Sequence, residues 1–408
     1  MSESCLEKQF RKKLAILQQN GGGKGKENVI TAVKAGENGW GPRYFLEGHG
    51  ERAFLRMNSN SYLGLSCHPQ LLAAEAAAAE RYGCGPGAVR FISGTYRPHQ
   101  QLEKKLAAFH QREAAMVFSA AYAAVLGVLP QIIDDQTLVV SDALNHNSII
   151  NAVRLARPAG KAVYAHLNLT ELDELLQSGK GRYTRVCVVT DGVFSMRGDY
   201  VPLAELQQLC RTHEQDFGRG IITIVDDSHG VGAFGDSGRG TEEITGGQAD
   251  ILIATLGKAL GVNGGFVVAG RVIIEFLRET APLYIYSNSI APAEAAAALQ
   301  ALEILDSQQG LEMLSRLRLL SERLRTGLRQ AGYSVLLGEH PIVPVLIGDT
   351  NRTAALVDYL FAEGILTSGL KYPVVPKGEE EIRLQVTAAH TETDIDWLIE
   401  VLAGFKMN

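Results

Sequence analysis

The sequence lacks the segments that mark export or insertion into a membrane. No apolar stretch near its start resembles the core of a signal peptide. It also has no uninterrupted apolar run of about 20 residues, the length that a membrane-spanning helix needs. We therefore expect a cytoplasmic protein that is neither exported nor embedded in a membrane.

Cysteine is scarce, and the five residues are scattered without a C-x-x-C pair. The cysteines are Cys5, Cys67, Cys84, Cys187 and Cys210. Such usage predicts reduced, mostly buried thiols, because cytosolic proteins rarely keep disulfides. It also gives no cysteine-based metal site.

An excess of positive charge is missing as well. Thirty-nine Lys and Arg residues face 45 Asp and Glu residues, for a net charge of −6. A nucleic-acid partner would need a basic face to meet the phosphates, so we expect none. The length of 408 residues and the 46% hydrophobic content do allow a large core, which favours two lobes.

A glycine-rich segment, GGGKGKEN at 21–28, follows a short amphipathic helix predicted for residues 1–20. It resembles a phosphate-binding loop only superficially, since no Ser or Thr follows the lysine and no strand precedes the glycines. A solvated linker is the better interpretation.

From about residue 58 the sequence alternates between helical and strand patterns. Alanine-rich helical stretches occur at 71–82 and 102–114. Apolar, β-branched runs occur at 137–143, 185–194, 220–229, 250–258 and 264–270. Runs that are apolar throughout indicate strands covered on both faces, as in a mostly parallel sheet of an α/β domain.

The apolar runs end in polar residues: SDALNH, TDGVFS, VDDSH and TLGK. Ligands of open α/β sheets bind beyond the carboxyl ends of the strands. We therefore expect these strand ends to form one site.

The pattern changes after about residue 290. Long helical stretches at 291–305 and 311–332 precede short strands at 333–337, 341–348 and 381–388. We predict an N-terminal arm over 1–57, a large domain over 58–290 and a smaller α+β domain over 291–408.

Lys258 lies between glycines at the carboxyl end of the apolar run 251–255. Desolvation there would lower the pKa of its amine and make it a nucleophile. Lysine amines form Schiff bases with carbonyl compounds and with pyridoxal phosphate. A surface lysine that follows a strand is the alternative.

Asp226 ends another apolar strand, and His229 follows three residues later. A buried carboxylate needs a cation or donors, and a pyridinium nitrogen is such a cation. His229 could then reach the phenolic oxygen of the same ring. The alternative is a metal pair, although no further ligand cluster with metal-like spacing lies nearby.

His146, at the strand end 141–146, could stack on a flat ring and exchange protons near neutral pH. A structural histidine is the alternative. Small and hydroxyl-bearing residues suit a phosphate. They are Ser119, Ala121, Tyr122, Thr255 and the segment 287–289.

Arg383 lies among apolar residues in the predicted strand 381–388. An arginine in such surroundings needs an anion, which could be a substrate carboxylate held by two hydrogen bonds. A structural salt bridge is the alternative.

Taken together, these segments resemble the α-oxoamine synthase family of fold-type-I pyridoxal-phosphate enzymes. The resemblance extends from about residue 40 to the end. It is carried by NSYLGLSCHP, VRFISGT, SDALNHNSII, DGVFSMRGD, VDDSHGVG, TLGKALG, YSNSIAPA and RLQVTAAH. VRFISGT, SDALNH, TLGKALG, YSNS and KYPVVPKG at 371–378 are most similar to the 2-amino-3-ketobutyrate CoA ligase branch, the glycine C-acetyltransferases.

The resemblance implies a large domain with a mostly parallel seven-stranded sheet and a smaller C-terminal domain. It implies pyridoxal 5'-phosphate as the cofactor and no metal. Lys258 would hold the cofactor as a Schiff base and remove the α-proton, Asp226 would pair with the ring nitrogen, and His146 would stack on the ring.

The remaining implied contacts follow the same pattern. His229 and Ser195 would bond the phenolic oxygen, and Thr255 with the Ala121 and Tyr122 amides would hold the phosphate. Ser287 and Asn288 would reach the phosphate from the neighbouring subunit of a homodimer. Arg383 would bind the amino-acid carboxylate, with Asn60 near the substrate.

The implied reaction condenses glycine with acetyl-CoA and often runs in reverse during threonine breakdown. Three positions depart from the family pattern, Ala121, Val125 and Arg197, and the arm 1–40 matches poorly. Val125 and the arm could alter the acyl-CoA contacts. The alternatives are an 8-amino-7-oxononanoate synthase, a promiscuous synthase, an aminotransferase, and a non-catalytic partner that keeps the fold.

Overall fold

The computed structural model describes residues 4–19, 27–372 and 375–405, and the chain divides into two compact units. The larger unit contains residues 60–319 and 338–341, and the smaller one contains 1–59, 320–337 and 342–408. Part of the predicted linker at 21–28 and part of 371–378 lie outside the described residues.

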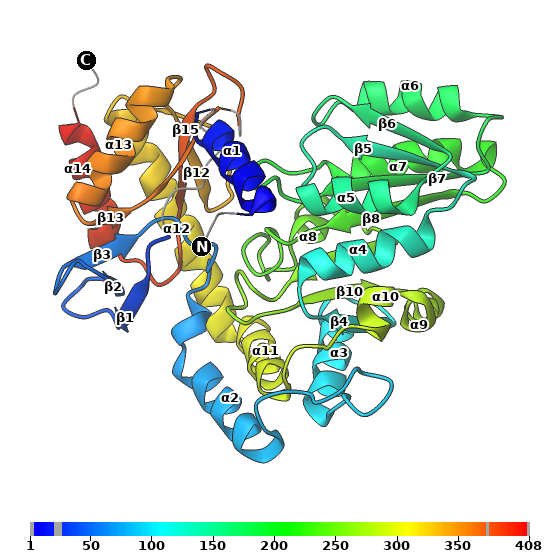
Figure 1. Ribbon diagram of the computed structural model, residues 1–408, viewed down its shortest axis with the longest axis horizontal. Helices are drawn as coiled ribbons and strands as arrows, with labels where there is room; N and C mark the ends of the chain where they lie inside the picture. Colours follow the sequence, from blue (N-terminus) through cyan, green and yellow to red (C-terminus); the bar gives the residue numbers. More distant parts are fainter. Residues whose placement is uncertain (1–3, 20–26, 373–374, 406–408) are drawn as a thin grey trace. The chain divides into compact units, whose positions relative to one another are not determined.

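The larger unit is built on a seven-stranded sheet in the order β4-β10-β9-β8-β7-β5-β6 (Figure 1). The strands are β4 (Ala114–Phe118), β5 (Thr137–Asp142), β6 (Gly160–Tyr164), β7 (Arg185–Asp191), β8 (Ile221–Asp226), β9 (Ile251–Thr255) and β10 (Gly265–Ala269). β6, β5, β7, β8 and β9 run parallel, whereas β10 is antiparallel to both of its neighbours. The mostly parallel sheet predicted from the sequence is confirmed.

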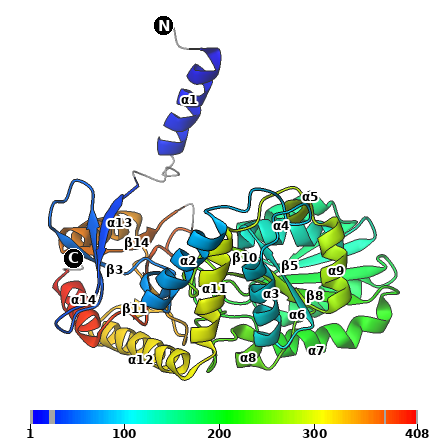
Figure 2. The same ribbon diagram turned by 90° about the horizontal axis from the view of Figure 1, so that it is seen from below.

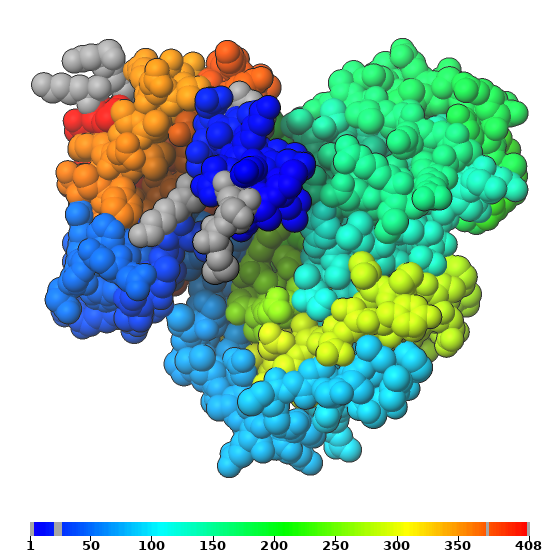
Figure 3. Space-filling model, in the orientation of Figure 1, coloured from blue at the N-terminus to red at the C-terminus, as the bar shows by residue number. Residues whose placement is uncertain are grey.

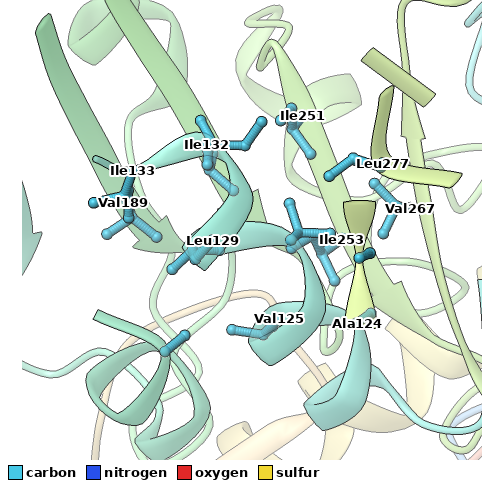
Figure 4. Close-up of a cluster of buried hydrophobic side chains, with 14 of the residues drawn as sticks. Ala124, Val125, Leu129, Ile132, Ile133, Val189, Ile251, Ile253, Val267 and Leu277 are labelled. Carbon is cyan, nitrogen blue, oxygen red and sulfur yellow. The ribbon is translucent and has the colours of Figure 1, made fainter. Parts of the chain in front are cut away.

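Helices cover both faces of this sheet, which explains why its central strands are apolar throughout (Figure 2). Several of them are α4 (Ala121–Ile132), α5 (Asn147–Ala156), α6 (Leu169–Gly179), α7 (Leu203–His213), α8 (Thr241–Thr245), α9 (Arg271–Thr280) and α10 (Pro282–Ile285). α4, α5, α9 and α10 cover one face and enclose a hydrophobic core against the strands. Leu129 of α4 lies among Val189, Ile253 and Val267 in that core (Figure 4).

Val125 belongs to the same core and is fully buried (Figure 4). Its side chain therefore packs in the core between α4 and the sheet. The expectation that this position alters acyl-CoA contacts stays a prediction.

Further helices of the larger unit pack beside each other. α2 (Pro69–Tyr82), α3 (Arg97–Phe109) and α11 (Pro292–Leu305) lie side by side, and the views in Figures 1 and 2 agree on this arrangement. The proline at the first position of α2 and the His68 side chain, which accepts from Gln70 N–H, define the start of that helix. Short 3-10 turns complete the unit at Leu65–Cys67 and Glu214–Asp216.

The smaller unit contains two four-stranded sheets. One has the order β1-β2-β3-β13, with β1 (Ile30–Lys34), β2 (Arg43–Leu46), β3 (Ala53–Arg56) and β13 (Ile365–Leu366). The other has the order β11-β12-β15-β14, with β11 (Ser334–Val335), β12 (Ile342–Leu346), β15 (Glu381–Gln385) and β14 (Ser368–Leu370). Helices α13 (Thr350–Ala362) and α14 (Glu392–Gly404) belong to this unit.

The division differs from the predicted domain boundaries. α11 packs on α2 and α3 and so belongs to the larger unit, and the division falls within α12 (Gln308–Gln330). The segment 30–56, predicted as part of an N-terminal arm, forms three strands of one sheet, in which β3 pairs with β13. Pairing between segments distant in sequence leaves no signal in local periodicity.

The N-terminal helix α1 (Cys5–Gln19) matches the predicted helix, and all of its residues are exposed (Figure 3). Only Cys187 and Cys210 are buried, so the expectation of mostly buried thiols is wrong for the three exposed cysteines. Within the described residues, no helix is both long and apolar enough to cross a membrane.

Gly265 marks a point where two backbones touch. A Cβ on Gly265 would lie 2.2 Å from the backbone nitrogen of Ala121 at the start of α4. Gly265 also pairs with Thr255 and Phe118, so the position is fixed from both sides of β10.

We expect Gly265→Ala to destabilise the protein by about 1–3 kcal/mol, because the backbone atoms of α4 must move to admit the methyl group. The midpoint of thermal unfolding by circular dichroism would fall. Gly218→Ala is the matched control, since a Cβ there meets nothing within 4 Å. An unchanged midpoint for Gly265→Ala would contradict the close approach.

Candidate active site

Four neighbouring parallel strands deliver polar side chains to one edge of the large sheet. β5, β7, β8 and β9 are adjacent in the sheet, so their carboxyl ends lie together. The residues at these ends are Asp142, Asp191, Asp226 and Thr255. The strand ends that the sequence analysis expected to form one site therefore lie at one edge of the sheet. The candidate residues lie at these strand ends or in the loops that follow them.

Lys258 lies in the loop 256–264 between β9 and β10. Leu256 N–H donates to Gly264 O at 3.0 Å, and Gly261 N–H donates to Lys258 O at 3.1 Å. The Thr255 hydroxyl donates to Gly264 O and accepts from Gly257 N–H. These bonds fix the backbone on both sides of Lys258, whose side chain is half-buried.

Asp226 is buried at the end of β8. Its Oδ1 accepts from Ser228 N–H at 3.2 Å and from the Ser228 hydroxyl at 2.5 Å. Ser228 engages one carboxylate oxygen, so the other can meet a cationic ring nitrogen. Ser228 was not predicted to have a role, although its place two residues after Asp226 in a D-x-S turn is the signal for such a local hydrogen bond.

His146 caps the first turn of α5. Its Nδ1 lies 2.7 Å from the Ser148 hydroxyl, and its backbone N–H donates to Asp191 Oδ2 at 3.0 Å. Burial lowers the pKa of His146, Asp226 raises it and Lys258 lowers it, with a net decrease. His146, Asp226 and Lys258 follow or end β5, β8 and β9 at the same edge of the sheet, and the net decrease in the pKa of His146 favours a neutral imidazole at pH 7.

Asp191 is a further member of the site that sequence reasoning did not single out. It faces Asp226 in the register of β7 and β8 and is 5% exposed. Its Oδ1 has no hydrogen-bond partner within the described ranges. Burial and the neighbouring Asp226 charge raise the pKa of Asp191 well above its usual value. The only sequence signal was its place at a polar strand end.

His229 is held by a tyrosine from the start of the larger unit. The Tyr62 hydroxyl lies 2.7 Å from His229 Nδ1, and His340 Nε2 lies 2.9 Å from the His229 carbonyl oxygen. Tyr62 N–H donates to Asn60 O at 2.9 Å, which brings the predicted substrate residue Asn60 close to the same group. Tyr62 was not predicted, although it lies in NSYLGLSCHP.

The N-terminus of α4 provides donors for a phosphate. Its N-cap is Ala120, whose methyl group makes no capping hydrogen bond, so the N–H groups of Ala121 and Tyr122 are open to an anion. Gly265 lies against this turn without a side chain to fill the space. The Tyr122 hydroxyl donates instead to Asn147 Oδ1 at 2.9 Å.

The other predicted site residues lie on separate segments. Ser195 begins the turn after β7, and Ser287 and Asn288 lie in the connection from α10 to α11. Arg383 is half-buried on β15 of the smaller unit, opposite Pro344 and Ser368. Their roles toward a cofactor or substrate stay predictions.

The alternative metal interpretation of the Asp226–His229 pair gains no further ligand. No group of three His, Cys, Asp or Glu side chains among the residues described is arranged to hold a metal ion. The hydroxyl of Tyr62 and that of Ser228 meet the two proposed ligands instead.

Comparison with known proteins identifies the family. The profile described as "Aminotransferase class I and II" matches residues 52–402. The 8-amino-7-oxononanoate synthase of Symbiobacterium thermophilum is 39% identical over 89% of this chain and 90% of its own. The mitochondrial 2-amino-3-ketobutyrate coenzyme A ligase of Bos taurus is 38% identical over 92% of this chain and 86% of its own. The chain belongs to the class I and II aminotransferases and, within them, to the α-oxoamine synthases.

Solved structures agree with this family. The serine palmitoyltransferase of Sphingomonas wittichii superposes with a TM-score of 0.87 at 27% identity, covering 98% of both chains. The fold is therefore that of the fold-type-I pyridoxal-phosphate transferases. As an α-oxoamine synthase the protein is a pyridoxal-phosphate-dependent acyltransferase.

The residues at the sheet edge fit pyridoxal phosphate. The uncapped start of α4 and the bare Gly265 can accept its phosphate, and Asp226 can meet its ring nitrogen. Lys258 supplies the amine for its aldehyde carbon. The family confirms the predicted cofactor, and these side chains could hold it.

We expect Asp191→Asn to raise the free energy of unfolding of the cofactor-free protein by about 1 kcal/mol. For a protein of this size, that gain corresponds to a rise of about 2–4 °C in the thermal unfolding midpoint. The folded-state pKa of Asp191 is raised, so stability is lost as pH rises from the unfolded-state value through the folded-state value. The gain from the amide should therefore be absent near pH 4 and should grow toward pH 8.

The amide oxygen of asparagine can still accept from His146 N–H, so the variant keeps the local bond. Asp135→Asn, at an exposed aspartate of the same unit, is the matched control. A midpoint that falls at every pH would show that Asp191 is ionised and compensated in the folded protein.

Proposed function

We propose that the protein is a glycine C-acetyltransferase, which condenses glycine with acetyl-CoA to give 2-amino-3-oxobutanoate and CoA, reversibly. The observation that carries the proposal is the placement of Lys258, Asp226 and His146 at the carboxyl ends of β9, β8 and β5 along one sheet edge, and the acyl transfer itself is supported by the family. The choice of glycine and acetyl-CoA is supported by segments that resemble that branch, such as VRFISGT and KYPVVPKG. A relative with that name is 38% identical.

The second candidate is an 8-amino-7-oxononanoate synthase, which would use alanine and pimeloyl-CoA. A relative with that name is 39% identical over a similar share of the chain. The two reactions share the amino-acid activation step and differ in the space that the side chain and acyl chain need.

Bound pyridoxal phosphate supplies a protonated ring that accepts the charge left when the amino-acid α-carbon loses a proton. Asp226 keeps the proton on the ring nitrogen, because a buried carboxylate favours the cationic form of its partner. Ser228 orients Asp226 through two hydrogen bonds to the same oxygen.

Lys258 has two roles in this proposal. Its Nζ would hold bound pyridoxal phosphate and would be freed when an amino acid takes its place. The freed amine stays within reach because the turn from Thr255 to Gly264 is closed by hydrogen bonds. Nζ then takes the proton from the α-carbon and acts as a general base.

The histidines orient the ring. Burial lowers the pKa of His146 and favours its neutral, flat imidazole, which can stack on the ring without adding positive charge. His229 is fixed by Tyr62, and Ser195 joins it at the phenolic oxygen in this proposal. Thr255 and the amides of Ala121 and Tyr122 hold the phosphate, and Arg383 binds the amino-acid carboxylate, with Asn60 beside the substrate.

We further infer a homodimer in which Ser287 and Asn288 complete the phosphate site of the partner subunit. The support is their place on an exposed connection, where the neighbouring Tyr286 is 80% exposed. A large aromatic side chain exposed to that extent suits an interface.

The first test is the release of free thiol by the cofactor-loaded enzyme. Glycine, alanine and serine are each offered with acetyl-CoA, pimeloyl-CoA and palmitoyl-CoA. We expect the fastest release with glycine and acetyl-CoA. Lys258→Ala should lower that rate by at least about 100-fold, because general base catalysis is lost.

Lys161→Ala, at an exposed lysine of the same unit, is the control and should keep the wild-type rate. Preference for alanine with pimeloyl-CoA would establish the second candidate. An absence of thiol release with every pair, despite bound cofactor, would refute acyl transfer with these substrates.

Complementation tests the shared site. Lys258→Ala and the double variant Ser287→Ala/Asn288→Ala are each expected to be nearly inactive alone. In a heterodimer of the two, both defects fall in one site and the other site is intact, so activity should return. Failure to recover activity in a purified heterodimer would contradict the shared site.

A further inference from the structure

The segment that carries Ser195 is a closed turn between β7 and an isolated bridge. Val193 pairs with Tyr200, Phe194 N–H donates to Asp199 O at 2.9 Å, and Gly198 N–H donates to Phe194 O at 2.8 Å. These contacts close the turn around Ser195. Groups that contact Asp199 or Phe194 therefore also help to fix the position of Ser195.

His166, which follows β6, holds this turn at two points. Its Nε2 lies 3.1 Å from Asp199 Oδ2, and its ring stacks edge-on against Phe194 with centroids 4.4 Å apart. Arg197 adds a contact from the turn itself, with Nε 2.9 Å from the same Asp199 oxygen. Arg197 is one of the positions where the sequence departs from the family pattern.

The other ring nitrogen of His166 reaches the strand that leads to His146. Nδ1 lies 3.0 Å from Oδ1 of Asp142, the last residue of β5. The Asp142 carboxylate also accepts from Leu144 N–H at 2.8 Å and from Leu167 N–H at 2.9 Å. One imidazole thus connects the turn of Ser195 with the segment that ends at His146.

An imidazole between two carboxylates donates from both nitrogens only as the cation. Burial alone would lower the pKa of His166, but the hydrogen bonds to Asp142 and Asp199 raise it to about 9. The groups that face the ring are these two carboxylates, with Arg197 behind Asp199. The folded-state pKa is raised, so the stabilisation is complete below the unfolded-state value and is lost as pH rises through about 9.

We propose that His166 is a positioning residue that, by bridging Asp142 and Asp199, sets the place of the Ser195 hydroxyl relative to His146 and so tightens the binding of pyridoxal phosphate. It touches neither cofactor nor substrate. The inference rests on the role proposed above for Ser195, and the test separates the two.

The test is a double-mutant cycle on cofactor binding. Apoprotein of the wild type, His166→Gln, Ser195→Ala and the double variant is titrated with pyridoxal 5'-phosphate, and Kd is measured from its visible absorption. We expect His166→Gln and Ser195→Ala each to raise Kd roughly tenfold at pH 7.5. The Kd of the double variant should not exceed the higher of the two single-variant Kd values, because both changes remove the same coupled interaction.

A matched histidine controls for general effects. His213 also lies between two carboxylates of the same unit, with Nε2 2.6 Å from Asp173 and Nδ1 3.3 Å from Asp216, at the end of α7. His213→Gln should leave Kd unchanged. Raising the pH from 7.5 to 10 should weaken cofactor binding more in His213→Gln than in His166→Gln, because only the former still has the His166 proton to lose.

The outcomes are distinct. A wild-type Kd for His166→Gln beside a raised Kd for Ser195→Ala would overturn the positioning role alone. Fully additive effects would overturn it as well. An unchanged Kd for Ser195→Ala would overturn the role of Ser195 and, with it, this inference. If His166→Gln fails to fold, Asp199→Asn removes the same charge pair and replaces it in the cycle.

Discussion

Buried carboxyl groups crowd one edge of the large sheet, and the site depends on how their charge is compensated. Asp191 and Asp226 end adjacent parallel strands and cannot both be ionised there at low cost. Lys258 brings the compensating charge from the next strand along. Ser228 donates two hydrogen bonds to one Asp226 oxygen, whereas burial raises the pKa of Asp191 and favours its neutral form.

The histidines around this edge divide into two electrostatic types. The pKa of His146 is lowered by its burial and by the Lys258 charge. His166 lies between two carboxylates, and its pKa is raised to about 9. One is therefore suited to stack on a cationic ring, whereas the other works as a fixed cation in the supporting structure. Side chains of one chemical type serve both purposes because their neighbours differ.

Sequence reasoning reached the elements whose signal is local. The runs at 137–143, 185–194, 220–229, 250–258 and 264–270 contain β5, β7, β8, β9 and β10. β6 was not predicted because its residues alternate between exposed and more buried at the sheet edge, so no continuous apolar run marks it. The antiparallel direction of β10 and the pairing of β3 with β13 depend on which distant segments meet. The same limit applies to the site: Lys258 and Asp226 stood out at strand ends, but the roles of Asp191, Tyr62 and His166 exist only through their neighbours.

The reversal of β10 has a consequence for how the site assembles. Because β10 returns antiparallel beside β9, Thr255 and Gly265 pair across a short connection that contains Lys258. Closing so short a loop costs little chain entropy, and hairpins form within about 1–10 µs. The other strand ends come together only through helical crossovers of many residues, which are slow to close. Of the connections that build the site, the one carrying the lysine is therefore the cheapest in loop entropy, and the acidic groups join it through longer ones.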